Sequence, residues 1–493
     1  MLNQPDTWRP VDAEIAFDGM ADAAGIDDEA RRWVRDLADE YARHAGHNRI
    51  LRDYYDGNVT VPDYGATADI PNDQTCHWPQ KAVDDLAARI RLETLSTDDG
   101  HQAALDAVVL RDDFVSNYNR HVPVKLLYGC EAATVTRGKD GLAHVRFHSA
   151  ETFTALPSPD FTDGVVAGGM AVSRRERTPW SDGRMVPTIV NLHVPGNIGE
   201  FRQVARGEWT YSAGPVREEL PTLYVFAHNA MGTIAPFGRT RITRFVRTLT
   251  DDAVRCLWHM QVSGTFYSMA KLYATGLTDA QFDSIMENKS AYQLSRILAL
   301  TNGPDGNTAN VGQLSGNSPQ PFIDELRALA CQFSGATGVP LNSLGIVQDN
   351  PSSAEAIGAA REDICLVAQR DIEADRSVIR RVLLAAMAVD GNATAAELGD
   401  VDVLAGYANP MINSLAARTD AALKVASVDD GFASSEQFYR MVGFDEADIR
   451  QMLDERRRAR AIDAVGALSS IGIESEEEDA EGGDGGRSAD GEV

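Results

Sequence analysis

The feature that most constrains how this chain folds is a long amphipathic pattern that ends at Asp390-Gly391-Asn392. Ser352 and Glu355 have the spacing of a capping box, so we expect the helix to begin near Ser353. Over residues 355–390, a helix rising 1.5 Å per residue would be a rod of roughly 50 Å. The residues that recur at mostly three- and four-residue steps are Ile357, Ala360, Ile364, Val367, Ala368, Asp371, Ile372, Val378, Ile379, Val382, Leu383 and Ala386.

The segment before this helix is predicted to be an oversized loop. Gly338, Pro340, Gly345 and Pro351 punctuate it, and no apolar periodicity runs through its middle. A loop of about fifteen residues that leads into so long a helix is unusual in a compact enzyme. We therefore expect residues 339–354 to have a function of their own. The polar residues of this loop are Asn342, Ser343, Gln348, Asp349, Asn350, Ser352 and Ser353, of which only Asp349 is charged.

Helical spacing predicts three segments in the first part of the chain, at 26–56, 80–92 and 102–128. Gly57 follows the first of them and is expected to end it. His44 and His47 are three residues apart on that helix, which would suit a pair of metal ligands. No third ligand is near in the sequence, so we interpret them as ordinary surface or core-edge histidines.

Gly129 marks a change to strand periodicity, and residues 131–228 are predicted to be rich in β-strands. Residues 143–148 alternate clearly, with Val145 and Phe147 on the apolar face. We interpret the opposite face as exposed to solvent rather than as a metal site, because an arginine between two histidines would repel a cation. The residues of that face are His144, Arg146 and His148.

A second long helix is predicted over about 239–273, with Phe245 among the residues of its apolar stripe. Basic residues cluster on one side of it. In so acidic a chain they suggest contacts with phosphate, but we favour salt bridges between subunits or plain solvation, since surface ion pairs usually decide little. These residues are Arg241, Arg244, Arg247 and Arg255.

The remaining segments are shorter. Residues 274–320 are polar and rich in turns, and a third helix is predicted at about 321–334. Three or four amphipathic helices are predicted within 394–470, including 434–442 and 446–468. The last twenty residues, 474–493, hold nine acids and one arginine, so we expect them to be disordered.

The overall composition limits the function. The chain has 46 basic and 73 acidic residues among 493, which argues against tight, non-specific binding to nucleic acid. A mostly acidic wall is still compatible with a duplex sliding past it, because it repels phosphate. The five cysteines are widely spaced and form no C-x-x-C, which predicts free thiols. Neither a signal peptide nor an apolar run long enough for a transmembrane helix is found, so no membrane association is expected.

No catalytic motif is present. The sequence contains no P-loop, no dinucleotide-binding glycine pattern, no H-E-x-x-H and no G-x-S-x-G. We therefore expect no enzyme activity, no cofactor and no metal. The residues alone predict an acidic α+β protein of several modules, with two long helices, a polar excursion between them and a turn-rich loop before the second.

The order of these elements resembles the portal proteins of tailed double-stranded DNA phages, of the siphophage type common among actinobacteriophages. Near the amino end the resemblance is carried by Leu51-Arg52-Asp53-Tyr54-Tyr55-Asp56-Gly57 and His77-Trp78-Pro79. Tyr128-Gly129-Cys130 precedes the strands, and Gly238-Arg239-Thr240-Arg241-Ile242 resembles a G-x-S-x-I position with Thr240 in place of serine. The strongest part is the stretch 334–357, and the resemblance covers about residues 40–390.

The resemblance implies a portal fold, with a ring of usually twelve subunits at one capsid vertex, in the virion. The modules it implies are a mixed α/β wing (1–235), a stem helix (236–273), a clip (274–320), a second stem helix (321–338), a tunnel loop (339–354), a long helix (355–390), a helical crown (391–473) and a disordered acidic tail (474–493). Clip residues expected to dock the terminase are Asn302, Asp305, Asn307 and Asn310.

The resemblance also implies partners. Double-stranded DNA would pass through the channel without sequence readout, and the largely neutral polar loop suits weak, reversible contact with it. The large terminase, the major capsid and scaffolding proteins and the head-completion proteins would bind the ring. Two alternatives stay open: another connector or capsid protein, and a hydrolase whose site shows no local motif.

Overall fold

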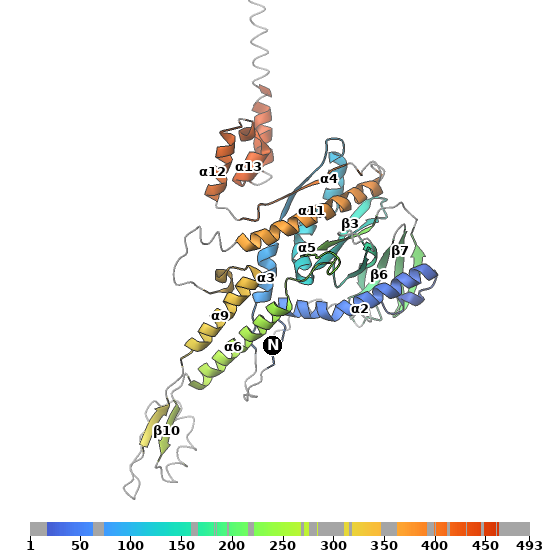
Figure 1. Ribbon diagram of the computed structural model, residues 1–493. Coiled ribbons are helices and arrows are strands. Elements are labelled where there is room, and N and C mark those ends of the chain that lie inside the picture. Colours follow the sequence, from blue (N-terminus) through green and yellow to red (C-terminus); the bar gives the residue numbers. More distant parts are fainter. Residues whose placement is uncertain are drawn as a thin grey trace, which may run out of the picture. The chain divides into compact units, whose positions relative to one another are not determined.

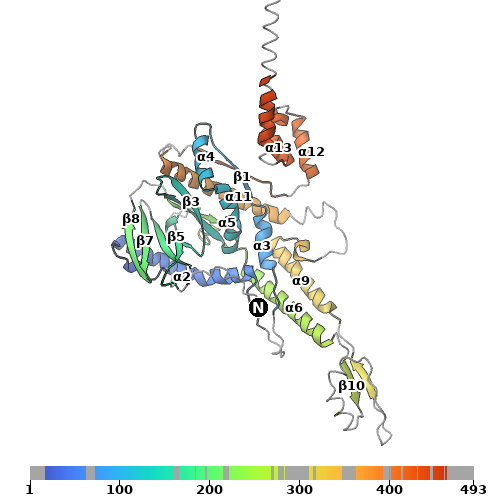
Figure 2. The same ribbon diagram turned by 180° about the vertical axis from the view of Figure 1, so that it is seen from behind.

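The computed structural model describes residues 17–62, 73–158, 166–181, 183, 185–194, 197–214, 221–267, 271–275, 283, 310–314, 318–346, 362–391, 399, 401–411, 415–429, 431–444, 448–459 and 461–462. The chain divides into two compact units, with the division after Pro410. Figures 1 and 2 show the elements of each unit from opposite sides. No helix in the described ranges is long and apolar enough to cross a membrane.

Two antiparallel sheets form the centre of the first unit, as far as its residues are described. The smaller has the strand order β3-β2-β9, and the larger has the order β4-β5-β6-β7-β8. They confirm the predicted β-rich region after Gly129. The strands are β2 (Cys130–Arg137), β3 (Ala143–Ser149), β4 (Phe153–Pro157), β5 (Val166–Arg177), β6 (Met185–Val194), β7 (Asn197–Ala205), β8 (Glu208–Ala213) and β9 (Leu223–Ala227).

Helix α2 (Asp28–Asp56) packs on the larger sheet (Figure 1). Asp27 caps its first turn by accepting a hydrogen bond from the Ala30 N–H at 2.7 Å. Gly57 ends it with φ at 70°, as the sequence predicts. The short 3-10 turn η1 (Met20–Asp22) adjoins β8, where the backbone of Ala24 pairs with that strand. Buried residues of this interface include Val34, Leu37, Tyr41, Met170, Val190, Phe201 and Trp209.

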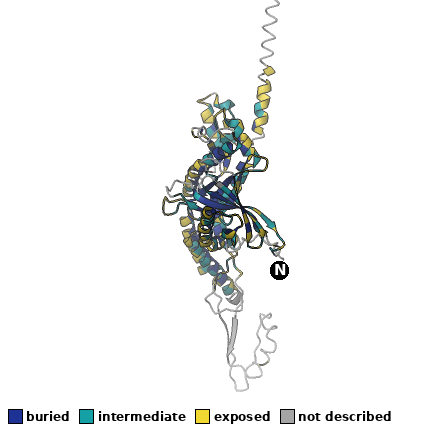
Figure 3. Ribbon diagram, turned by 90° about the vertical axis from the view of Figure 1, so that its right-hand side faces the viewer, coloured by how far each residue is buried: buried dark blue, intermediate teal, exposed yellow. Residues whose placement is uncertain are grey.

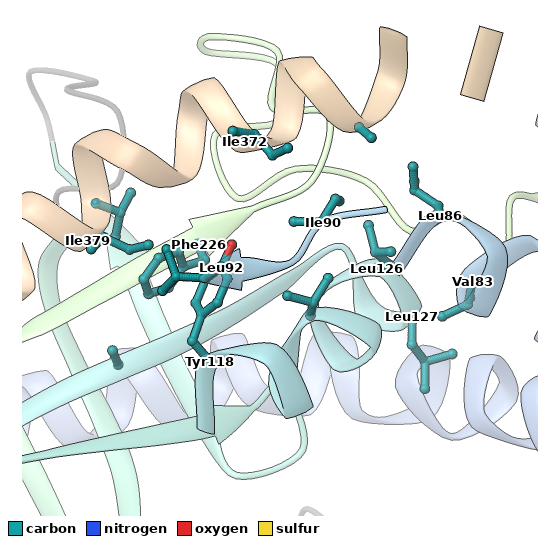
Figure 4. Packing of buried hydrophobic residues seen from close by; sticks show 14 of the residues in the cluster. Val83, Leu86, Ile90, Leu92, Tyr118, Leu126, Leu127, Phe226, Ile372 and Ile379 are labelled. Carbon is teal, nitrogen blue, oxygen red and sulfur yellow. The ribbon is translucent and has the colours of Figure 1, made fainter. Parts of the chain in front are cut away.

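The main core lies where helices pack on the smaller sheet. Helices α3 (Trp78–Ala87), α5 (Phe114–Tyr128) and α11 (Glu362–Asp390) contribute to one continuous apolar cluster. Figure 4 shows Ile372 and Ile379 of α11 facing Phe226 of β9 and Tyr118 of α5. Figure 3 shows that the buried residues concentrate around these strands and helices. The long amphipathic helix ends at Asp390, as the sequence predicts. Its described part begins at Glu362.

Two of the predicted helical segments need correction. The segment 80–92 is a helix only from Trp78 to Ala87, and β1 (Leu92–Ser96) follows it. The segment 102–128 is two helices, α4 (Gln102–Arg111) and α5. Asp113 breaks the run with φ at 48°, and the carboxylate of Asp112 accepts a hydrogen bond from the Val145 N–H at 2.8 Å. Apolar periodicity continues across this break, so the sequence pattern did not indicate it.

The prediction that the whole polar face of β3 meets solvent is wrong at its end. Arg146 is exposed, but His148 is buried, and its Nε2 lies 2.8 Å from the hydroxyl of Thr134 on β2. Burial lowers the pKa of His148 to about 3, with His193 and other nearby cations adding to the effect. The larger sheet packs beyond this end of β3, and single-strand alternation cannot reveal such a neighbour.

We therefore predict a stability that falls with pH below 6.5. His148 stays neutral in the folded chain down to a pKa of about 3, whereas the ordinary pKa of a histidine, expected in the unfolded chain, is 6.5. Between these values the unfolded state takes up the extra proton, which costs the fold about 1.4 kcal/mol per pH unit. His148→Gln should flatten this part of the profile, as measured by urea unfolding between pH 4 and 7. An unchanged slope in the variant would contradict the assignment.

Two glycines join the end of α5 to the segment that precedes α6 (Arg244–Tyr267). Gly129 and Gly238 both have left-handed backbone, with φ at 94° and 79°. A Cβ at Gly238 would lie 2.3 Å from the His228 carbonyl oxygen. Thr240 then donates its hydroxyl to the Leu127 carbonyl at 2.6 Å, which satisfies a free acceptor at the end of α5. The motif 238–242 thus packs tightly on the end of α5 and is not the first turn of a helix.

Gly238→Ala should destabilise the fold strongly, because the new methyl group would collide with backbone and not with a movable side chain. Gly141→Ala is the matched control: its φ is 83°, but nothing lies within 4 Å of the added carbon. The control should cost about 1–2 kcal/mol for the left-handed conformation alone. We expect a clearly larger drop in the unfolding midpoint for Gly238→Ala. Equal drops would show that the close approach is not a constraint.

Helix α6 is shorter at both ends than the predicted 239–273. Thr243 caps it, and residues 271–273, expected in the helix, belong to strand β10 (Lys271–Thr275). Strand β10 pairs antiparallel with β11 (Asn310–Leu314). The chain returns through α9 (Gln320–Thr337), which confirms the third predicted helix with a longer span. Helices α6 and α9 lie side by side in Figures 1 and 2.

The boundary predicted for the helical crown, at residue 391, lies too early in the chain. Residues 401–410 belong to the first unit, and β12 (Leu404–Tyr407) pairs antiparallel with β1. The second unit contains α12 (Leu415–Ala426), the 3-10 turn η4 (Phe432–Ser434), α13 (Glu436–Val442) and a helix at 448–459. Ser435 caps α13 by accepting from the Phe438 N–H at 3.3 Å, near the predicted start. The basic run of that last helix places Arg456 over the ring of Tyr439, 5.4 Å from its centroid.

Candidate functional site

The predicted loop is only partly a loop. Its first residues form the 3-10 turn η2 (Leu341–Leu344), and Val339 is fully buried. Leu341, Leu344 and Ile346 pack against the main core, so apolar side chains dock the first part of the predicted loop, 339–346. Asn342 is exposed and Ser343 half-buried. The predicted residues Gln348, Asp349, Asn350, Ser352 and Ser353 lie outside the described residues.

The docked segment returns to the start of the long helix. Gly338 ends α9 with φ at 70°, and a Cβ there would lie 3.3 Å from the backbone nitrogen of Ile364. Residue 338 is therefore in contact with the first described turn of α11. The chain that leaves the core after Ile346 and the helix that resumes at Glu362 are both attached to the same packed body.

The basic residues near α6 do not form a stripe. Arg241 lies before the helix and is largely buried, and it donates to the carbonyls of Ala82, at 3.3 Å, and of Thr337. Burial lowers the pKa of Arg241, although Asp371 opposes the shift. Because Thr337 is the last residue of α9, this contact puts the positive charge of Arg241 at the negative end of that helix. The interpretation of Arg241 as a phosphate contact is therefore wrong.

The other three arginines differ among themselves. Arg244 is exposed, and Arg247 lies over the ring of Tyr54, 6.0 Å from its centroid. Arg255 pairs with Asp252 at 2.6 Å, one turn away on the same helix. Arg255 therefore has an acidic partner within its own chain, and the alternative of salt bridges between subunits stays a prediction.

The residues predicted for the clip are described only at one point. Asn302, Asp305 and Asn307 lie outside the described residues. Asn310 is the first residue of β11 and pairs with Thr275 of β10. The polar excursion between α6 and α9 therefore includes an antiparallel pair of strands.

A buried ionic cluster, which the sequence analysis missed, holds α11 in the first unit. Lys125 of α5 is fully buried, and its Nζ lies 2.5 Å from Asp375 Oδ2 and 3.9 Å from Asp371 Oδ2. Burial lowers the pKa of Lys125, but the two carboxylates outweigh it and the pKa is raised. Burial raises the pKa of Asp375, whereas Lys125, His228 and Arg241 together hold the pKa of Asp371 below its usual value.

Polar partners complete the cluster. His228, just after β9, places its Nδ1 2.7 Å from Asp371 Oδ2. Tyr118 donates to Asp375, and Tyr407 of β12 donates to the hydroxyl of Tyr118 at 3.0 Å. The sequence did hold a signal, because Asp371 stands within the apolar stripe of α11 and Asp375 follows one turn later. A buried carboxylate requires a partner.

The role of this ionic cluster is to hold several elements of the first unit together. It joins α5, α11, the end of β9 and β12, and its members are enclosed by the main core. In the described part of the chain, no three histidine, cysteine, aspartate or glutamate residues lie close enough to hold a metal ion. The five cysteines are free thiols, as predicted. What this arrangement provides is a rigid seat for α11 and for the two ends of the chain that flank 347–361.

Two curated proteins resemble this chain over about half its length. The portal protein of Mycobacterium phage D29 is 25% identical over 287 residues, 56% of this chain and 57% of the relative. The portal protein of Mycobacterium phage L5 is 24% identical over 239 residues, 47% of this chain and 48% of the relative. The chain is similar in sequence to these two phage portal proteins. The matches span about half the length of these portal relatives, and no family model matches the chain.

Solved structures with some likeness come from gene transfer agent particles. The virion of a native particle gives a TM-score of 0.40 at 12% identity, covering 81% of this chain and 93% of the solved one. The neck of a native particle, computed with C12 symmetry, gives 0.38 at 12% identity, covering 75% and 90%. We base no argument on these scores, which are low.

Lys125→Met should lower the free energy of unfolding by about 3–5 kcal/mol, because it leaves two buried carboxylates without their cation. Lys81→Met is the matched control, since Lys81 is half-exposed and lies 3.9 Å from Asp85. The control should change stability by less than about 1 kcal/mol. Urea unfolding of both variants measures the difference. Similar, small effects would mean that the cluster does not hold α11.

Proposed function

We propose that the protein is a phage portal protein, which forms a ring at one vertex of the capsid and provides the channel for DNA. The observation that carries this proposal is the sequence similarity to the portal proteins of phages D29 and L5. A structural role is the first part of the proposal. The ring of twelve copies, the virion location and the passage of double-stranded DNA in both directions belong to the proposal.

Helices α6 and α9 are proposed to carry contacts between copies in the ring. The two helices pack against each other, and the excursion between them includes the antiparallel strands β10 and β11. Phe245 of α6 was expected in the apolar stripe, yet 51% of its surface is exposed, and Ile323 of α9 is 42% exposed. We assign these two side chains to the contact between neighbouring copies.

The segment 339–354 is proposed as the part that meets DNA. Its proposed contacts are Asn342, Ser343, Gln348, Asp349, Asn350, Ser352 and Ser353. Support comes from the attachment of both flanks to a rigid core, which lets a loop touch a passing duplex without moving the ring. Neutral polar groups bind phosphate weakly and read no sequence. Arg244, which is exposed, is the one member of the former basic stripe that we retain as a candidate phosphate contact.

The excursion between the two helices is proposed as the docking site of the large terminase and, later, of the head-completion proteins. Asn302, Asp305, Asn307 and Asn310 are the proposed contacts. Capsid and scaffolding proteins would contact the ring elsewhere. Another connector protein remains the second candidate, and a channel wide enough for DNA separates the two.

Replacing Gln348-Asp349-Asn350 by three glycines should leave the ring intact and reduce DNA packaging. The substitution avoids Leu341, Leu344 and Ile346, whose loss would damage the core. Particle mass and electron microscopy measure the ring, and nuclease-protected genome in complemented phage measures packaging. Gln320→Ala, an exposed change at the start of α9, is the control. Normal genome filling by the glycine variant would contradict the loop's role, and a protein that never forms rings would contradict the portal function itself.

A further inference from the structure

A cavity of about 610 Å³ opens between strands β3 and β5, and nothing in the proposed channel function uses it. Its walls come from different layers: β3 of the smaller sheet, the second half of β5 in the larger sheet, and the start of α5. Phe147 and Ser149 line it from β3, and Ser173 and Arg174 line it from β5. The cavity therefore separates two sheets at a place where each presents a strand edge.

Strand β3 turns its outer edge toward this cavity. It is the outer strand of its sheet, with β2 on its other side. Backbone groups alternate between the two edges of an antiparallel strand. The N–H groups of Ala143 and Val145 point outward, because they donate to Asp390 at 2.6 Å and to Asp112 at 2.8 Å. Phe147 is next in this alternation, so its N–H and C=O also point outward.

The outer edge of β3 is closed on both sides of Phe147. Side chains bind the N–H groups of Ala143 and Val145, and the carbonyl of Ser149 accepts from the Thr152 N–H at 2.7 Å. Between these points no hydrogen bond within the described residues covers the outward backbone groups of Phe147. An open stretch of strand edge is a ready template for another strand.

Strand β5 forms the opposite wall. Strand β4 pairs with β5 only up to Ala171, and β5 continues to Arg177. The ladder with β6 is irregular between Val172 and Arg175, which turns this end of β5 away from a regular path. Arg146 reaches across from β3 and donates to the Ser173 carbonyl at 3.3 Å. The two walls are therefore fixed relative to each other at one side of the cavity.

The cavity is basic in a chain of net charge −27. Arg146, Arg174 and Arg175 line it, with one carboxylate, Asp112, which already binds Val145 and His144. Arg174 pairs with Glu176 at 2.6 Å, but both side chains are about half exposed. Such a pair is worth little, so an incoming carboxylate can replace Glu176 readily.

We propose that this cavity, the β3–β5 slot, binds an extended segment of a partner protein that carries acidic side chains. The segment would add as a strand to the outer edge of β3, with hydrogen bonds to the N–H and C=O of Phe147. Strand addition draws its affinity from main-chain bonds and its specificity from alternate side chains. Those alternate side chains would be acidic, toward Arg146 and Arg174. The proposal depends on the geometry of the slot and not on the channel function.

Three short labelled peptides test the slot with the full-length protein, by fluorescence anisotropy at low salt. The probe alternates threonine and glutamate, a second peptide alternates threonine and lysine, and a third is the probe N-methylated at alternate amides. We expect saturable binding of the probe alone, with affinity at least about tenfold weaker for the methylated peptide, since it cannot complete a ladder. Equal binding of the probe and its methylated form would overturn strand addition, and no binding of the probe would overturn the proposal.

A pair of arginine variants locates the binding. Arg146→Glu should weaken the probe about tenfold or more, because it places like charge against the acidic side chains. Arg202→Glu is the matched control: this exposed arginine lies on β7, pairs with Glu200 and does not line the slot. Equal loss in both variants would show general attraction to basic surface and would overturn the assignment. Unfolding midpoints of both variants verify that they fold.

Amide hydrogen exchange gives a second, independent measurement. The probe should slow exchange of the Phe147 N–H in the unaltered protein, while amides of β7 keep their rates. Protection that falls elsewhere, with Phe147 unaffected, would overturn the proposal even if the probe binds. Self-association through the β3 edge that the probe fails to compete would assign the edge to a second copy of this chain and would overturn it as well. A failure to form rings would leave these outcomes unchanged, so the two proposals fail separately.

Discussion

The contact between Lys125 and the two aspartates of α11 is the constraint on which the rest of the first unit depends. An ammonium group with no exposed surface is tolerated only beside carboxylates, and Asp371 and Asp375 can supply them in just one rotation and one register of the helix. Apolar side chains alone would let a long helix slide by a turn at small cost. The cluster therefore determines where α11 lies, and the apolar core determines how firmly it is held.

This register of α11 determines further contacts, at the end of the helix and along its exposed side. At its end, Asp390 receives the guanidinium of Arg111 at 2.8 Å and the Ala143 N–H, which ties α11 to α4 and to the edge of β3. Along the exposed side of α11, Arg380 donates to the carbonyls of Gly399 and Val401, which precede β12 in the chain. Strand β12 in turn supplies Tyr407 to the ionic cluster. Residues that come late in the chain thus complete a core that the earlier ones begin.

Local signals in the sequence predicted the elements well, and contacts between elements account for what they missed. Gly57 and Gly391 marked the last turns of α2 and α11, and the change in periodicity after Gly129 marked the start of β2. Apolar period alone could not show that Asp112 leaves the helix to bind β3, or that residues 401–410 add a strand to β1, because both depend on partners distant in sequence. The same reason explains Arg241, whose acceptors lie on α3 and α9. The prediction for 339–354 rested on its polar residues. It overlooked the apolar side chains that pack the first half of this segment on the core.

The contact between Gly338 and the first described turn of α11 bears on how such a protein can vary. When the two ends of a loop rest on one packed body, the entropy of closing it grows only with the logarithm of its length, about 0.6 kcal/mol for each doubling. Insertions or deletions between residues 347 and 361 therefore leave the body almost undisturbed. Related proteins can therefore differ in the length of this segment without any compensating change in the core.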